Sequence, residues 1–286
     1  MSLFALPKPD IVEMCMNSYC CFSSLASRLL LLASCLLTFL TACAPQPLTV
    51  TPEPVVLRLV AANSCVPLTE QLIAAYEKAY PWVTVELIGA FNSAVAERSL
   101  RAGEADVALL SWPAAEVDGE ALWSQPFARH GVAVVAHPSN SFTETDLGHL
   151  QAIYRGRIQE WDGVTLTAIS REEGSGLRAV FDSVVLDRYD VTHTAVVMSS
   201  NEAILEYVAR TPGAIGYASA QLARNFSGVR VLPVEGVSPT QEAVSEGSYP
   251  FSHSFYLATI GQPAGASREF AQWVLGPQGR AVVRQR

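Results

Sequence analysis

The sequence contains no run of basic residues. Its 286 residues include 19 lysines and arginines against 27 aspartates and glutamates, which gives a formal net charge of −8 and a pI near 5.2. Proteins that bind nucleic acid neutralise its phosphates with clustered lysine and arginine, so a nucleic-acid partner is not expected. Half of the residues are hydrophobic and 16% are charged. This balance favours a globular chain with one large domain or two of ordinary size.

The sequence also lacks an apolar run of the roughly 20 residues that a transmembrane helix needs. Residues 29–40 form an almost unbroken apolar run of 12 residues, a length that fits the core of a secretory signal. The sequence at its end, Leu40-Thr41-Ala42-Cys43, resembles the lipobox of bacterial lipoproteins, in which the cysteine is lipidated and becomes the first residue of the mature protein. This resemblance implies a signal peptide over residues 1–42 and a lipid on Cys43. Three methionines are candidate start sites: Met1, Met14 and Met16.

Paired cysteines are missing from the expected mature chain. Of the six cysteines, four precede position 43 and one occupies it, which leaves Cys65 alone. One thiol cannot form an internal disulfide, and no spacing of cysteine and histidine is typical of a metal site. We therefore expect no disulfide framework, no metal and no other cofactor.

A proline-rich segment precedes a regular alternation of strands and helices. Residues 43–54 contain four prolines and predict an extended tether. The hydrophobic pattern then predicts strands over 55–61, 83–88 and 106–111 and helices over 67–80 and 93–102. Strands separated by helices pair in parallel and form an α/β sheet, and ligands collect where such strands end. This rule marks three loops: 63–66, 91–93 and 111–113.

The rest of the chain continues with less regular spacing. Further strands are expected over 130–137, 166–169, 213–217, 229–233 and 254–260. Further helices are expected over 147–154, 202–210, 267–275 and 280–283. Ser199 and Glu202 are spaced as a capping box for the helix that starts at 202.

The segment Ser170–Arg178, with the sequence SREEGSGLR, is the strongest candidate for a binding site. It joins a predicted strand to a predicted helix, and a helix start attracts anions through its unpaired N–H groups and its dipole. Gly174 and Gly176 allow close approach, while Ser175 offers a hydroxyl. Arg171 offers a fork-shaped guanidinium that can meet two oxygens. An ordinary N-cap at Ser175 with a solvated Arg171 explains the same residues, so both interpretations stay open.

A catalytic serine is not indicated. Ser175 stands in Gly-Ser-Gly and not in the Gly-x-Ser-x-Gly elbow of hydrolases. No histidine has a sequence context that marks it as a catalytic base. We therefore expect that the protein is not an enzyme.

Four segments, taken together, are more specific than any one of them: 146–161, 170–176, Gly213–Tyr217 and Tyr249–Ser252. Together, in this order, they resemble the phosphate-binding proteins of bacterial ABC phosphate importers, a branch of the type II periplasmic binding protein superfamily. The resemblance implies an α/β fold of two lobes, each a mostly parallel sheet flanked by helices, joined by two crossover strands. Lobe I would comprise residues 55–130 and 250–286, and lobe II residues 131–249.

The resemblance also implies candidate ligand contacts. Arg171, Ser175 and Gly176 match the family's second-lobe phosphate contacts. Ser93 matches a first-lobe hydroxyl contact at the start of a helix. The loop Ser64-Cys65-Val66 stands where the family uses a threonine and the following backbone N–H. At this position Cys65 either replaces the threonine as a weak hydrogen-bond donor or is a small buried thiol that fills space.

Two positions depart from the family pattern. Leu177 stands where a threonine is usual, and Trp112 stands where the best-known members have an aspartate that accepts a hydrogen bond from protonated phosphate. An indole only donates, so this sequence predicts weaker selectivity for phosphate over other tetrahedral oxyanions. Trp112 itself either lines the cleft or covers the core.

Together, these features predict an extracytoplasmic, lipid-anchored solute-binding protein that captures phosphate or a similar oxyanion between two lobes. Its partners would be an ABC permease and ATPase, with the lipid anchor in the membrane, and we expect a monomer. The alternative is a sensor or adhesion module of the same fold that has no transport role and a degraded anion site. Leu177 and Trp112 motivate that alternative.

Overall fold

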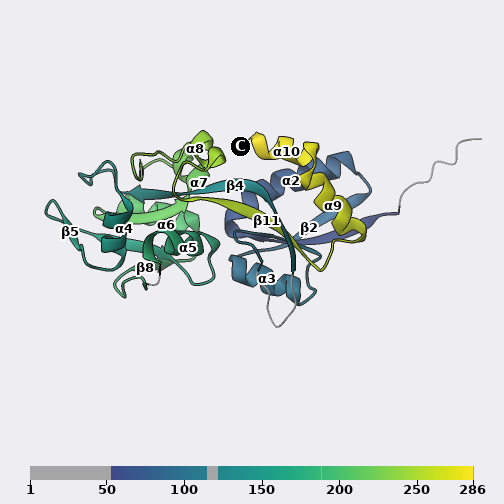
Figure 1. The fold of residues 1–286 in the computed structure, drawn as a ribbon, viewed down its shortest axis with the longest axis horizontal. Helices are drawn as coiled ribbons and strands as arrows, with labels where there is room; N and C mark the ends of the chain where they lie inside the picture. The colour runs from purple at the N-terminus through teal and green to yellow at the C-terminus, as the bar shows by residue number, and fades with distance from the viewer. Residues whose placement is uncertain (1–52, 115–121, 188, 286) are drawn as a thin grey trace, which may run out of the picture. The chain divides into compact units, whose positions relative to one another are not determined.

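The computed structural model describes residues 53–114, 122–187 and 189–285. The expected signal peptide, Cys43 and most of the expected tether lie outside these residues. The described chain folds as a two-lobe α/β protein whose lobes share one sheet (Figure 1). In this part of the chain, no helix is long and apolar enough to span a membrane.

The first lobe combines the N-terminal strands with the C-terminal helices. Its elements are β1 (Val55–Ala62), the 3-10 turn η1 (Asn63–Cys65), α2 (Val66–Ala79), β2 (Val83–Phe91), α3 (Ser93–Arg101), β3 (Val107–Leu110), α9 (Gly265–Leu275) and α10 (Pro277–Arg284). β1 pairs in parallel with both β2 and β3, as the alternation of strands and helices predicts. Leu59 of β1 packs in a core with α2 and α9, whereas Val60 packs in a second core with α3. Alternate residues of β1 therefore face helices on opposite sides of the sheet.

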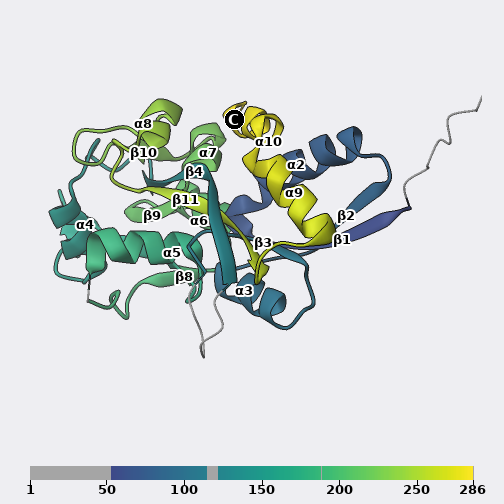
Figure 2. The ribbon, with the colours of Figure 1, turned by 45° about the vertical axis from the view of Figure 1, so that its right-hand side comes forward.

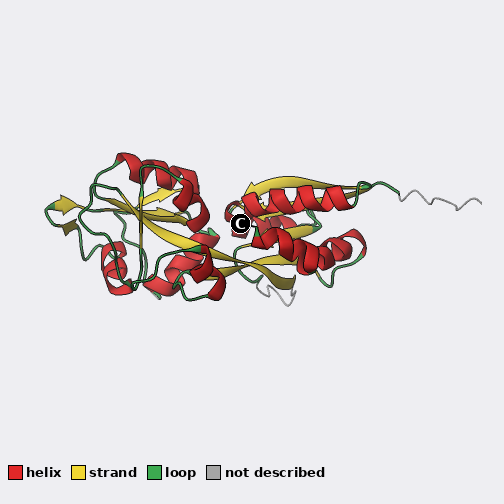
Figure 3. Cartoon of the chain, turned by 90° about the horizontal axis from the view of Figure 1, so that it is seen from above, coloured by secondary structure: helices red, strands yellow, loops and turns green. Residues whose placement is uncertain are grey.

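The second lobe repeats this layering, and Figure 3 shows helices on both faces of the strands. Its elements are α4 (Leu147–Tyr154), β5 (Glu160–Trp161), β6 (Val164–Thr165), β7 (Thr167–Arg171), α5 (Gly176–Phe181), the π-turn η2 (Asp182–Leu186), β8 (Val196–Met198), α6 (Asn201–Arg210), β9 (Ala214–Ser219), α7 (Ala220–Asn225), β10 (Arg230–Leu232) and α8 (Gln241–Glu246). β7 pairs in parallel with β8 and β9. The ring of Phe181 stacks on Tyr217 at 4.1 Å and 8° within one of the two cores.

Two long strands pass from one lobe to the other, β4 (Leu122–Ala136) and β11 (Ser252–Ile260). The strand order of the sheet is β2-β1-β3-β11-β4-β9-β7-β8, with β10 on β4. β4 pairs antiparallel with β11 in its first part and with β9 in its last part. Figure 2 shows the two strands side by side between the lobes. They are the crossover strands that the fold class requires.

Two local expectations need correction. The strand expected over 130–137 begins at Leu122, because Pro126 lies at a register shift in the pairing with β11 and hides the strand pattern. The capping box of Ser199 and Glu202 is wrong: Ser200 is the N-cap of α6, and its hydroxyl accepts a hydrogen bond from Ala203 N at 3.0 Å. The carbonyl of Ser199 instead accepts a hydrogen bond from Arg171.

Candidate functional site

Polar residues from the first lobe gather where its parallel strands end. Ser64 follows β1, Ser93 follows β2 and Ser111 follows β3. All three side chains are buried. The hydroxyls of Ser64 and Ser111 are hydrogen-bonded at 2.6 Å, and Ser111 N donates to Ser93 Oγ at 3.3 Å. The three serines thus form one connected cluster of small, uncharged groups.

The second lobe contributes Arg171, the last residue of β7. Its side chain is only 1% exposed. Its Nε and Nη2 donate to the two carboxylate oxygens of Glu172 at 2.9 and 3.1 Å, and Nη2 also donates to Ser199 O at 3.0 Å. Its Nη1 is buried and has no hydrogen-bond partner among the described residues. A buried cationic donor without a partner is costly, so Nη1 is suited to receive an anionic oxygen.

The backbone at Arg171 is held by Tyr217. Burial raises the pKa of Tyr217 to about 12, so its hydroxyl stays protonated at neutral pH. That oxygen accepts a hydrogen bond from Arg171 N at 3.1 Å and bonds with Ser170 Oγ at 2.9 Å. The end of β7 is therefore fixed by side chains from the core of the second lobe.

The loop after β7 lies directly on the first lobe. Ala94 N donates to Gly174 O at 3.2 Å. Gly174 has a φ of +83°, and a Cβ there would come within 2.9 Å of Ala94 Cβ. A Cβ on Gly176 would overlap the side chain of Ser111. Two glycines are thus required by the close contact of the lobes, one of them also by its backbone conformation.

A small cavity lies between these groups. It is lined by Ala62, Asn63, Ser64, Asn92, Ser93, Arg171, Ser175, Gly176 and Leu177. Its volume is about 10 Å³, which is room for about one water molecule. A tetrahedral oxyanion is larger, so its entry requires the lobes to separate.

The structure brings together five of the eight expected contact residues: Ser64, Ser93, Arg171, Ser175 and Gly176. The other three do not line the cavity. Cys65 lies in the core, with its Sγ 3.9 Å from Ser111 Oγ, and Val66 is the first residue of α2. Trp112 lies half-buried, and its Nε1 donates to Glu97 Oε2 at 3.0 Å.

The segment Ser170–Arg178 has features of both an ordinary N-cap and an anion site. Ser175 is the N-cap of α5, with its Oγ 3.5 Å from Arg178 N. Arg171, however, is buried at the cavity and not solvated. Leu177, the departure inside the loop, is 1% exposed and belongs to the core of the second lobe as well as to the cavity wall. An apolar side chain thus occupies one side of an otherwise polar site.

Residue types alone did not single out Asn63, Asn92 and Ser111. Each lies in one of the three loops that the strand-end rule marks. Asn92 caps α3 by accepting a hydrogen bond from Val95 N at 3.0 Å, and its Nδ2 lies 3.5 Å from Glu173 O on the second lobe. The position of a residue at a strand end was therefore a better signal than its chemistry.

A two-lobe α/β fold that encloses a small polar cavity is the architecture of periplasmic-type binding proteins. A family model described as "PBP superfamily domain" matches residues 49–278, and the chain belongs to this family. The chain is similar to the phosphate-binding protein PstS of Bacillus subtilis, with 28% identity over 190 residues, 64% of this chain and 61% of that protein. It is 36% identical to PstS 2 of Streptococcus agalactiae over 129 residues, 42% of this chain and 43% of that one.

Its fold matches a crystal structure of a putative phosphate ABC transporter substrate-binding protein from Clostridium perfringens with bound phosphate. The TM-score is 0.71 at 23% identity, over 80% of this chain and 97% of that chain. At this identity the match shows the fold alone. The chain aligns with less than two thirds of the length of the curated relatives.

Proposed function

We propose that this protein binds phosphate or a similar tetrahedral oxyanion between its lobes and delivers it to an ABC importer. The observation that carries the proposal is Arg171, which lines a cavity shared with Ser64, Ser93 and Ser175 and whose buried Nη1 has no partner among the described residues. The relatives named phosphate-binding proteins support the choice of ligand.

Binding follows from exchange of hydrogen bonds. The hydroxyls of Ser64, Ser93 and Ser111, which bond within their own cluster, turn to donate to the oxygens of the anion. Arg171 Nη1 adds a charge-assisted bond from the other lobe. Because the ligand contacts both lobes, it holds them together in a closed arrangement whose cavity is wider than the one in this structure.

The finer parts of the proposal concern processing, membrane attachment, the boundaries of the lobes and the transport partners. Residues 1–42 would be a signal peptide, Cys43 the lipid-carrying residue and residues 43–54 the tether to the membrane outside the cytoplasm. Residues 55–130 and 250–286 would form lobe I and 131–249 lobe II. Permease and ATPase subunits would receive the ligand from a monomeric protein that catalyses no reaction.

Isothermal titration tests the proposal. The purified chain should bind phosphate, and the Arg171→Ala variant should bind it roughly 10- to 150-fold more weakly, since a buried charge-assisted bond contributes about 1.5–3 kcal/mol. Arg210→Ala is the matched control, because Arg210 is 78% exposed and lies on α6. If phosphate, sulfate, molybdate and tungstate all fail to bind, the protein does not capture an oxyanion for transport. That result would favour the alternative of a sensor or adhesion module.

A further inference from the structure

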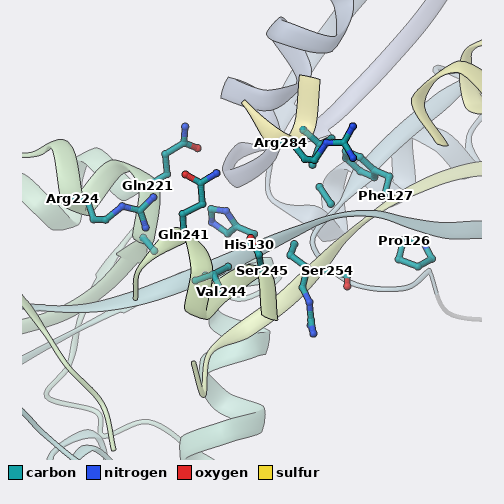
Figure 4. A pocket seen from close by; sticks show the side chains of 15 residues that line it. Pro126, Phe127, His130, Gln221, Arg224, Gln241, Val244, Ser245, Ser254 and Arg284 are labelled. Carbon is teal, nitrogen blue, oxygen red and sulfur yellow. The ribbon is translucent and has the colours of Figure 1, made fainter. Parts of the chain in front are cut away.

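A second, larger pocket lies on the other side of the crossover strands (Figure 4). Its volume is about 400 Å³, within the range of pockets that hold small organic molecules. α7 and α8 of the second lobe form one wall, and Arg284 of α10 belongs to the wall from the first lobe. The floor comes from β4, including Phe127 and His130. We call this space the hinge-side pocket.

The charge of the hinge-side pocket is opposite to that of the chain. Arg129, Arg224 and Arg284 all line it, in a protein with a net charge of −8. Arg224 is held in place because its Nη1 donates to Pro239 O at 2.7 Å. Gln221 and Gln241 also line the pocket, and in Figure 4 Arg224 extends toward Gln241. Several guanidinium groups beside amide donors favour a ligand with more than one carboxylate or phosphate group.

The floor adds an apolar surface to these donors. Pro126, Phe127 and Val244 line the same space. A Cβ on Gly131 of β4 would come within 2.6 Å of Val244 Cγ2, so α8 packs tightly against the crossover strand at this point. The combination suits a short carbon skeleton that carries several acidic groups.

The hinge-side pocket and the cavity lie on opposite sides of β4 and β11. Figures 1 and 2 show α7, α8 and α10 on one side of these strands and α3 and α5 on the other. A rotation about the crossover strands that separates Ala94 from Gly174 would bring α10 toward α7 and α8. Opening the cavity therefore narrows the hinge-side pocket.

We propose that the hinge-side pocket binds a small organic polyanion and that its occupancy favours the closed arrangement of the lobes. A ligand that fills the space between α10 and α8 opposes the rotation that opens the cavity. By linkage, the polyanion and the oxyanion then each raise the affinity for the other.

Titration with citrate, a tricarboxylate, tests the binding site. We expect saturation below about 1 mM with the unmodified chain, and a loss of at least fivefold in affinity in the double variant Arg224→Gln/Arg284→Gln. Arg210→Gln and the cavity variant Arg171→Ala should bind citrate as the unmodified chain does, and the uncharged ester triethyl citrate should not bind. The proposal is overturned if citrate does not bind the unmodified chain. It is also overturned if the double variant binds citrate with unchanged affinity, or if Arg171→Ala abolishes citrate binding.

Titration of phosphate in saturating citrate tests the coupling. Phosphate affinity should rise severalfold in the unmodified chain and stay constant in the double variant. An unchanged affinity in the unmodified chain would contradict the coupling, while failure of phosphate to bind without citrate would contradict the proposed function separately. The variants should unfold at the same midpoint as the unmodified chain. Equal midpoints show that the losses of affinity come from the substituted site and not from unfolding.

Discussion

The two lobes bring different chemistry to the same cavity. The first lobe offers Ser64 and Ser93, which are neutral and are both hydrogen-bonded to Ser111. The second offers Arg171, whose Nη1 has no partner among the described residues. A hydroxyl can exchange its serine partner for an oxygen of an anion at little cost, whereas a buried cation without an acceptor is destabilising. Under the proposed function, the second lobe would set the charge of the ligand, and the first would set how closely its oxygens are fitted.

The largest effect on phosphate affinity is expected at Arg171, where two substitutions distinguish the contribution of its charge from that of its shape. Arg171→Ala should weaken phosphate binding roughly 10- to 150-fold, because it removes a charge-assisted bond of about 1.5–3 kcal/mol from a buried site. Arg171→Lys should recover part of this loss, because it restores the charge without the fork that meets two oxygens. Titration calorimetry measures both variants. Equal affinity of Arg171→Ala and the unmodified chain would show that the second lobe does not set the charge.

The next effect tests the contact between the lobes without changing any charge. Gly176→Ala should weaken phosphate binding on the order of tenfold or more, because the new Cβ overlaps Ser111 and holds the lobes apart. Small-angle scattering with phosphate should show that this variant stays more open than the unmodified chain.

Gly148→Ala is the matched control for that variant. Gly148 lies in α4, away from the cavity, and a Cβ there meets only Asp146 Oδ1, at 3.3 Å. This substitution should leave phosphate affinity unchanged. If Gly176→Ala also closes fully with phosphate, the contact between the lobes is less restrictive than we infer.

A smaller effect concerns the first lobe. Ser64→Ala and Ser111→Ala should each weaken phosphate binding about tenfold, the equivalent of one hydrogen bond of about 1–1.5 kcal/mol. Because the two hydroxyls bond to each other, the double variant should lose less than the sum of the single variants. Strict additivity of the two losses, measured by calorimetry, would mean that the serines do not act as one cluster.

The smallest effect is expected at Trp112. Trp112→Phe should change phosphate affinity less than about twofold, because the indole bonds with Glu97 and does not line the cavity. A modest loss of stability of about 1 kcal/mol is expected, since Glu97 Oε2 loses a donor. A tenfold loss of affinity without a change in unfolding would place Trp112 at the ligand.

The sequence was sufficient for the elements that depend on local pattern. The expected alternation of strands and helices over 55–111 is confirmed, with helix α2 shifted by one residue at each end. The family assignment is confirmed by the match over residues 49–278. The rule that ligands collect at strand ends also marked the loops that hold Ser64, Ser93 and Ser111.

The rest depends on contacts between residues far apart in the chain. The bond between Ser64 and Ser111 joins positions 47 residues apart, and no local pattern encodes it. The first part of β4 was missed because its pairing with β11 passes through a bulge at Pro126. The burial of Arg171 beside Glu172 and Ser199 likewise follows from packing of the second lobe, which the motif alone does not specify.

A crystal structure with phosphate tests the central claim most directly. It should place one phosphate oxygen within about 3.2 Å of Arg171 Nη1 and others near the hydroxyls of Ser64 and Ser93, with the bond between Ser64 and Ser111 broken. Phosphate bound away from Arg171, or a cavity that keeps its serine cluster intact at saturating phosphate, would contradict the account.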